Sequence, residues 1–167
     1  MNLAASAAWM TAALLLLSPA AAAAAGSAMP DHAPAPEPAT EGTTPPHRVA
    51  APKNAYVYLG WPNDGEVIHS TRFRVWFGTR NFGVCPAGFD RANTGHHHLL
   101  IDVPLPPLDE PIPHDKNHLH FGAGETETVL ELPPGRHTLQ LLMGDANHVP
   151  HDPPVLSRRI SITVRAD

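Results

Sequence analysis

The pattern of apolar and polar residues after residue 53 is that of short β-strands. Residues 71–78 alternate, with phenylalanine or valine on one face and arginine or tryptophan on the other. A period of two is typical of a strand with one buried face. Residues 125–132 alternate in the same way, and the second half of 155–164 does so too. No window after residue 53 has the period of a helix, so the pattern predicts a domain made of strands.

Turn-forming residues separate these segments. Pro62-Asn63-Asp64-Gly65 and Pro133-Pro134-Gly135 predict tight turns, and Gly- or Pro-rich stretches at 79–94, 104–117 and 144–154 predict loops. We expect strands at 55–61, 71–78, 96–103, 118–121, 125–132, 137–143 and 155–164. About seven short strands at this spacing predict an all-β fold, an immunoglobulin-like antiparallel sandwich.

The segment 134–141 fits the penultimate strand of such sandwiches. In that strand a turn glycine precedes a ring-bearing side chain and then alternating aliphatic residues. His137 takes the place of the corner tyrosine, whose ring bonds back to the backbone. We therefore expect a structural role for His137.

The N-terminal part of the chain differs in composition. Residues 3–25 carry no charge and are mostly alanine and leucine, which is typical of a secretory signal peptide. An uncleaved anchor is the alternative, because no Lys or Arg precedes the apolar run. Residues 26–53 are rich in Pro, Ala and Thr, as in a disordered linker. We expect a signal peptide over 1–25, a linker over 26–53 and a sandwich over 54–167. The mature protein is expected in the periplasm or secreted, with no stable membrane span after cleavage.

Charge and cysteine content narrow the function classes. The net charge is −5 with neutral histidines, and the Lys and Arg residues are scattered, so the chain has no basic footprint for nucleic acid. Cys85 is the only cysteine, which excludes an intrachain disulfide. The domain must be held together by its core or by a metal. Because the chain has 12 histidines, as many as glycines, the imidazoles are the main candidates for chemistry.

Strand parity divides the three consecutive histidines His96, His97 and His98. His97 alternates with aliphatic residues and should face the core, as a core histidine rather than a ligand. His96 and His98 then face the other way, and Asp102 shares their parity. The sequence thus predicts two imidazoles and one carboxylate on the non-core face.

A second pair of histidines has the same parity. In the strand expected at 118–121 the apolar residues face the core, which leaves His118 and His120 on the opposite face. A two-residue step spans about 6.6 Å, and metal–nitrogen bonds are about 2.0–2.1 Å long, so such a pair can converge on one ion. If the two strands pair in register, all four imidazoles share one patch.

The loop after the His137 strand supplies three further candidate ligands, Asp145, His148 and His151. Imidazole and carboxylate together suit Zn(II), Cu(II) or Ni(II), whereas thiolate and thioether are too scarce for a dedicated Cu(I) carrier. We expect copper or zinc as the ion. The predicted metal-ligating residues are His96, His98, His118, His120, Asp102, Asp145, His148 and His151.

Two other interpretations stay open. The histidines could form a hydrogen-bonded network that orders the loops of a structural or partner-binding module without metal. Alternatively, His96-x-His98-xxx-Asp102 resembles the first metal motif of cupins, with Asp in place of Glu, and residues 133–137 resemble the second. The cupin resemblance implies a metalloenzyme whose ligands are His96, His98, Asp102 and His137. We favour a binding protein over an enzyme.

Four motifs carry a more specific resemblance. The stretches 83–88, 93–102 (NTGHHHLLID), 118–122 (HLHFG) and 133–141 (PPGRHTLQL) together resemble an uncharacterised bacterial family, catalogued as a domain of unknown function in exported proteins. The resemblance covers nearly all of 55–164. It implies export and a compact β domain, and it implies no particular activity.

A looser likeness is to periplasmic copper-resistance sandwich proteins, which place Asp and His after a comparable strand. This likeness implies that Asp145 and His148 are ligands. The sequence therefore predicts an exported, histidine-rich sandwich that binds copper or zinc for sequestration, delivery or metal-stabilised recognition. Its expected partners are the metal ion and a periplasmic protein.

Overall fold

The computed structural model describes residues 47–166, which form nine strands and no helix. The strands are β1 (Tyr56–Trp61), β2 (Val67–Ile68), β3 (Arg72–Arg80), β4 (Gly83–Val84), β5 (Thr94–Ile101), β6 (His118–Phe121), β7 (Glu127–Glu131), β8 (Gly135–Gly144) and β9 (Ile160–Val164). No helix in this part of the chain has the length and apolarity needed to cross a membrane. The predicted signal peptide and the linker up to residue 46 lie outside the described residues.

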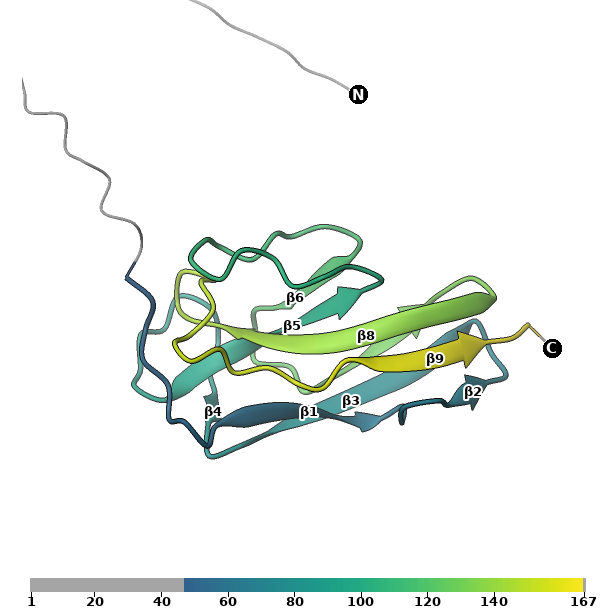
Figure 1. Ribbon diagram of the computed structural model, residues 1–167, viewed down its shortest axis with the longest axis horizontal. Coiled ribbons are helices and arrows are strands. Elements are labelled where there is room, and N and C mark those ends of the chain that lie inside the picture. The colour runs from purple at the N-terminus through teal and green to yellow at the C-terminus, as the bar shows by residue number, and fades with distance from the viewer. Residues whose placement is uncertain (1–46, 167) are drawn as a thin grey trace, which may run out of the picture. The chain divides into compact units, whose positions relative to one another are not determined.

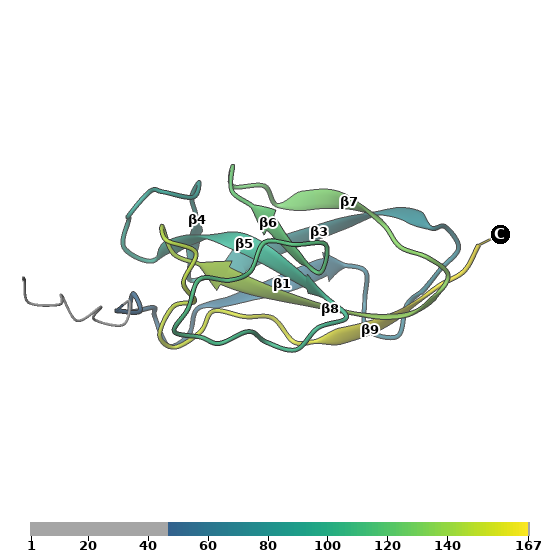
Figure 2. The ribbon, with the colours of Figure 1, turned by 90° about the horizontal axis from the view of Figure 1, so that it is seen from above.

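The strands form two stacked sheets of unequal size, which confirms the predicted all-β sandwich (Figure 1). The smaller sheet has the antiparallel order β1-β3-β7. The larger sheet has the order β2-β9-β8-β5-β4, and β6 also pairs with β5. The short strands β2 and β4, which the sequence did not predict, pair in parallel with β9 and β5. Seen from above, the two layers overlap along their length (Figure 2).

Alternating residues of both sheets fill the space between them. Phe73, Val75 and Phe77 of β3 are buried, whereas Trp76 is 46 % exposed on the outer face. This confirms the alternation of buried and exposed residues predicted for 71–78. The larger sheet contributes the buried side chains Leu99, Ile101, Leu139, Leu141, Met143 and Ile162. Each such side chain stabilises the fold by about 1.5–3 kcal/mol relative to an exposed position.

His97 belongs to this core, as predicted. Its ring is buried and its centroid lies 4.7 Å from that of Phe77. Its Nδ1 lies 3.1 Å from the carbonyl oxygen of Glu125, to which it donates. Burial, partly offset by this bond, lowers the pKa of His97 to about 4. The ring therefore packs as a neutral, largely apolar group.

His137 forms the predicted corner. Its Nε2 donates to the carbonyl oxygen of Pro133 at 2.9 Å, and its Nδ1 donates to the Asp102 carboxylate at 2.7 Å. Burial alone would lower the pKa of His137, but the two bonds, chiefly that to Asp102, raise it overall. Both partners only accept hydrogen bonds, so they favour the doubly protonated ring.

Asp102 departs from its predicted place. β5 ends at Ile101, and Asp102 adopts a left-handed conformation with φ of 58°. Its Oδ1 accepts the backbone N–H of Thr138 at 2.7 Å, and its other oxygen binds His137. These bonds draw the carboxylate toward the start of β8, so the expectation that it shares a face with His96 and His98 is corrected.

Two loops cover the outer face of the larger sheet and bury it. Leu100 of β5 and Leu142 of β8 form a second apolar cluster with Ile112 from the loop after β5. The backbone N–H of Ile112 donates to the carbonyl oxygen of His148, at 2.9 Å, in the loop after β8. The two loops therefore brace each other, and the face that parity assigns to solvent is closed.

The chain before β1 also packs on the loop after β8. Ala50 pairs with Asp152 in a parallel bridge, and the backbone N–H of Ala51 donates to the carbonyl oxygen of Asp152 at 2.9 Å. The Arg48 side chain donates to the carbonyl oxygens of Pro150 and His151. Residues 48–51, assigned above to the end of the linker, are thus ordered by backbone pairing.

Candidate metal site

Strand pairing brings the two predicted histidine pairs onto one face. β6 lies beside β5 in the register His98 opposite His120 and Leu100 opposite His118. On the other side of β5, Gly144 of β8 lies opposite His96. The condition left open by the sequence, that the two strands pair in register, is therefore met.

Four imidazole rings gather at this place, and we call them the four-histidine cluster: His96, His98, His120 and His148. His96 lies 4.8 Å from His98 and 4.9 Å from both His120 and His148, centroid to centroid. His120 lies 4.8 Å from His148. The longest of the six separations is 5.9 Å, between His98 and His148. The rings come from two strands and one loop.

The ring centroids have the spacing of imidazoles around one ion, and the three rings whose nitrogens converge are His96, His98 and His120. With metal–nitrogen bonds of about 2.0–2.1 Å, the ring centroids of a tetrahedral site lie about 5.2 Å from one another. One ring nitrogen each from His96, His98 and His120 already lies within 4.8 Å of the other two. In a tetrahedral site with these bond lengths the ligand nitrogens lie about 3.4 Å apart. Closure on one ion therefore requires the longest nitrogen separation to shorten by about 1.4 Å.

The loop that carries His148 is held in a fixed conformation. Oδ1 of Asp145 accepts the backbone N–H groups of Asn147 at 2.8 Å and Val149 at 2.9 Å. The backbone N–H of His148 donates to the Asp145 carbonyl oxygen at 3.0 Å, and His148 has φ of 69°. Asp145 thus organises the loop that places His148 against the strands.

Burial favours the neutral form of three of the cluster histidines. His96 and His98 are 0 % exposed. Burial first, and then repulsion from neighbouring histidines, lowers the pKa of His96 to about 3 and that of His98 to about 2. The same two causes lower the pKa of His120. Neutral imidazoles are the form that binds metal.

The cluster leaves several buried nitrogens without partners. Nε2 of His98 and Nε2 of His96 lie 3.0 Å apart and share one hydrogen bond. Nδ1 of both residues and Nε2 of His120 have no hydrogen-bond partner among the described residues. Buried polar atoms are usually paired, and each unpaired one costs about 1–3 kcal/mol. These unpaired ring nitrogens are therefore available to bind a ligand.

Two glycines make room for the rings, and the sequence analysis did not single them out. A Cβ at Gly144 would lie 3.0 Å from Nε2 of His98, and one at Gly122 would lie 2.3 Å from Cε1 of His120. A side chain at either position would therefore press on a cluster ring. The sequence signal was that Gly122 directly follows the His118–Phe121 strand, while Gly144 ends the Gly135–Gly144 strand.

The other four predicted ligands lie outside the cluster. His118 binds Asp115, with Nδ1 2.9 Å from Oδ1. His151 is buried, with its ring centroid 5.0 Å from that of Phe82. Asp102 is held by His137, and Asp145 by its own loop. Since Asp102 and His137 bind each other and the His137 ring faces the core, the structure does not assemble the cupin-like set.

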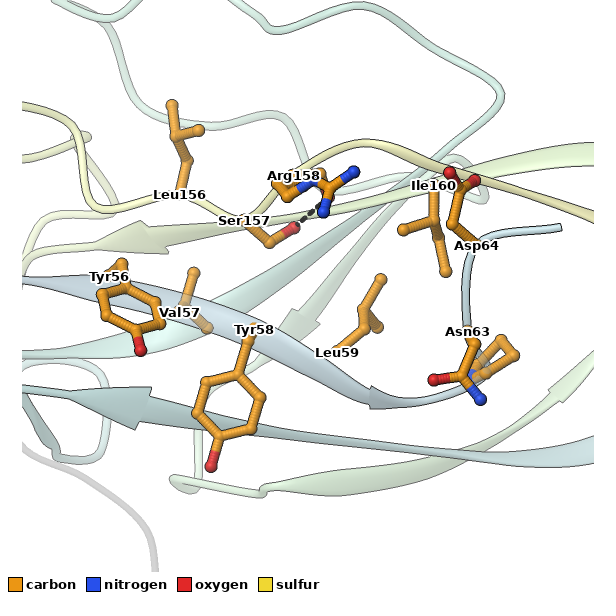
Figure 3. Close-up of a pocket in the computed structure, with 11 residues that line it drawn as sticks. Tyr56, Val57, Tyr58, Leu59, Asn63, Asp64, Leu156, Ser157, Arg158 and Ile160 are labelled. Carbon is orange, nitrogen blue, oxygen red and sulfur yellow. Dashed lines mark hydrogen bonds between the residues drawn. The ribbon is translucent and has the colours of Figure 1, made fainter. Parts of the chain in front are cut away.

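A separate groove lies between β1 and residues 156–160 (Figure 3). Its volume is about 390 Å³. Val57 and Leu59 point from β1 into the groove, whereas the rings of Tyr56 and Tyr58 point the other way. The groove is thus lined largely by apolar side chains, and none of the four clustered histidines lines it.

Comparison with known proteins supports one assignment. A family described as a domain of unknown function (DUF4399) matches residues 75–165, which include every strand that carries a cluster histidine. No curated protein and no solved structure matches the chain. The match confirms the resemblance to a domain-of-unknown-function family, while the likeness to copper-resistance sandwiches stays a prediction. Because the match covers more than half of the 167 residues, the chain belongs to the DUF4399 family.

Proposed function

We propose that this protein is an exported metal-binding sandwich that holds one zinc or copper ion in the four-histidine cluster. The observation that carries the proposal is the gathering of four imidazole rings whose centroids have the spacing of a metal site. The unpaired buried nitrogens support it, because a bound ion offsets the cost of burying them. Export rests on the uncharged Ala- and Leu-rich stretch of residues 3–25.

The ring arrangement favours zinc. A tetrahedral site makes all six centroid separations equal, at about 5.2 Å, whereas a square-planar site makes four of about 4.5 Å and two of about 6.4 Å. In the cluster the separations run from 4.8 to 5.9 Å, with five at 5.1 Å or below. This near-equality suits the tetrahedral preference of zinc better than the tetragonal preference of Cu(II).

The number of ligands favours storage, delivery or structural use of the ion over catalysis. Structural zinc sites have four protein ligands, whereas catalytic sites keep one position for water or substrate. His96, His98 and His120 would supply three ligands, and His148 as the fourth would complete the coordination. We therefore propose sequestration, delivery or metal-stabilised recognition as the role.

The second candidate is a metal-free histidine network, and the hydrogen bond between His96 and His98 favours it. Such a network stabilises a fold when every member is satisfied. Here three ring nitrogens of the cluster have no partner among the described residues. The network is therefore incomplete without an additional ligand.

Calorimetric titration tests the proposal. The full chain is stripped with chelator and titrated with Zn(II) and, separately, with Cu(II) at pH 7. We expect one ion per chain and a Kd tighter than about 1 µM, equivalent to about −8.2 kcal/mol. His120→Ala should weaken binding at least about tenfold, since it removes a ligand, in line with the tenfold or greater losses seen even for supporting residues.

The matched control is His118→Gln, which changes the neighbouring histidine of the same strand. Its ring is directed to Asp115 rather than to the cluster, so its titration should match that of the wild type. If neither Zn(II) nor Cu(II) binds with a Kd below about 1 µM, the proposed function is refuted.

A further inference from the structure

A fifth histidine lies at the edge of the cluster. The ring centroid of His114 is 5.4 Å from that of His120, a separation close to those within the cluster. His114 belongs to the covering loop after β5, which the sequence analysis treated as a plain connection.

Two anchors fix the position of His114. Two residues before it, Ile112 is buried against the outer face of the sheet and donates its backbone N–H to His148. One residue after it, Asp115 forms a bridge with His118, whose ring it also binds at 2.9 Å. The approach of His114 to His120 is therefore built into the loop.

Exposure rises in steps from the bottom of the cluster to this ring. His96 and His98 are fully buried, His120 and His148 are half-buried, and His114 is exposed. An ion from solvent that first meets His114 passes next to His120 and only then reaches the buried pair. The rings thus form a series of nitrogen ligands whose solvent exposure increases from His96 and His98 to His114.

We propose that His114 is the capture ligand of the site: it binds the incoming ion at the surface and passes it to His120, without remaining a ligand in the final complex. This inference rests on the proposed function. A ligand used only in transit lowers the barrier to both uptake and release. His114 therefore sets the exchange rate of the metal and leaves its affinity unchanged.

Stopped-flow kinetics with Zn(II) on the full chain tests this role. Uptake is followed by transfer from a weak chromogenic indicator, and release by transfer to an excess of strong chelator. His114→Ala should slow both rates by about tenfold, which corresponds to about 1.4 kcal/mol in each barrier, with an unchanged Kd. His114→Asp, which supplies a carboxylate oxygen in place of the imidazole nitrogen, should recover most of the lost rate.

His69→Ala is the matched control, because His69 is also exposed and follows β2. β2 lies by register near Gly135, nine residues along β8 from Gly144, or roughly 30 Å away. The control should exchange zinc at the wild-type rates.

Three outcomes separate the possibilities. If His114→Ala takes up zinc at the wild-type rate while the wild type binds tightly, the capture role is wrong and the proposed function stands. If only release is faster and the Kd rises, His114 is a resident ligand and the capture role is again wrong. If the wild type binds neither Zn(II) nor Cu(II), the proposed function itself fails.

Discussion

Replacing both buried histidines of β5 tests whether the cluster is kept for a ligand or for stability. The double variant His96→Leu/His98→Leu puts aliphatic side chains of similar volume beside Leu100 and Leu142, which already form an apolar cluster on this face. It removes the hydrogen bond between the two rings together with both unpaired Nδ1 atoms. Removing both partners at once leaves no new unpaired group within the pair.

The expected change in stability follows from these atoms. Relief of two unpaired nitrogens gains about 3 kcal/mol, at about 1.5 kcal/mol each, and loss of one hydrogen bond costs about 1 kcal/mol. We expect the metal-free variant to be more stable than the metal-free wild type by about 2 kcal/mol. The variant should also lose metal binding, since it keeps only two of the four rings.

The effect should depend on pH. The unfolded histidines titrate near pH 6.5, whereas burial lowers the folded pKa of His96 to about 3 and that of His98 to about 2. The unfolded state therefore takes up protons first, so wild-type stability is complete above pH 6.5 and is lost as the pH falls toward the folded values. For two histidines the slope approaches about 2.7 kcal/mol per pH unit. The double variant lacks both histidines, so it does not show their loss of stability at low pH.

Urea unfolding in the presence of chelator, followed by circular dichroism at pH 7.5 and pH 5, measures both effects. Excess zinc should stabilise the wild type, by about 4 kcal/mol at a thousand times the Kd, and leave the variant unchanged. His97→Leu is the control, since its ring lies on the opposite face. It should preserve metal binding. A metal-free double variant less stable than the wild type by 1 kcal/mol or more would refute the reasoning and favour the metal-free network.

Two further predictions follow from the contacts of the site and of the corner. Gly144→Ala should weaken zinc binding at least about tenfold, because its Cβ would press on His98 Nε2; calorimetry measures this, and an unchanged Kd would show that the rings do not need this space. Asp102→Asn should destabilise the protein more at pH 6 than at pH 8.5. The raised pKa of His137 gives stability that is complete below the unfolded pKa of about 6.5 and is lost as the pH rises through the folded pKa. Urea midpoints at both pH values measure it, and equal losses would contradict a charged pair.

The alternation of apolar and polar residues and the turn residues correctly predicted the longer strands of the fold. The alternation in β3 identified its buried face, and the Pro-Pro-Gly turn before His137 identified the corner. β2 and β4 were missed because each has two residues, too few to show a period. Asp102 was misplaced because its carboxylate takes it out of the strand to bind β8, and parity assumes that the strand continues.

The candidate site was predictable only in part, for a similar reason. Parity placed His96, His98, His118 and His120 on one face, and it separated His97 from them. It could not show that His118 turns to Asp115, or that Asp145 serves its own loop. These outcomes depend on hydrogen bonds between neighbouring segments whose geometry the alternation does not encode.

The sequence by itself determined the strand class of the domain, the face of each histidine that lies on a strand and the choice of imidazole as the candidate chemistry, because these follow from local alternation and composition. Only the tertiary structure decided that β6 lies beside β5 and that a loop adds His148. It also decided that two loops bury the rings that parity had placed outside. The physical reason is that convergence and burial arise from contacts between distant segments. A histidine on the outer face of a strand becomes a candidate ligand only when other segments bring their rings to it and exclude water.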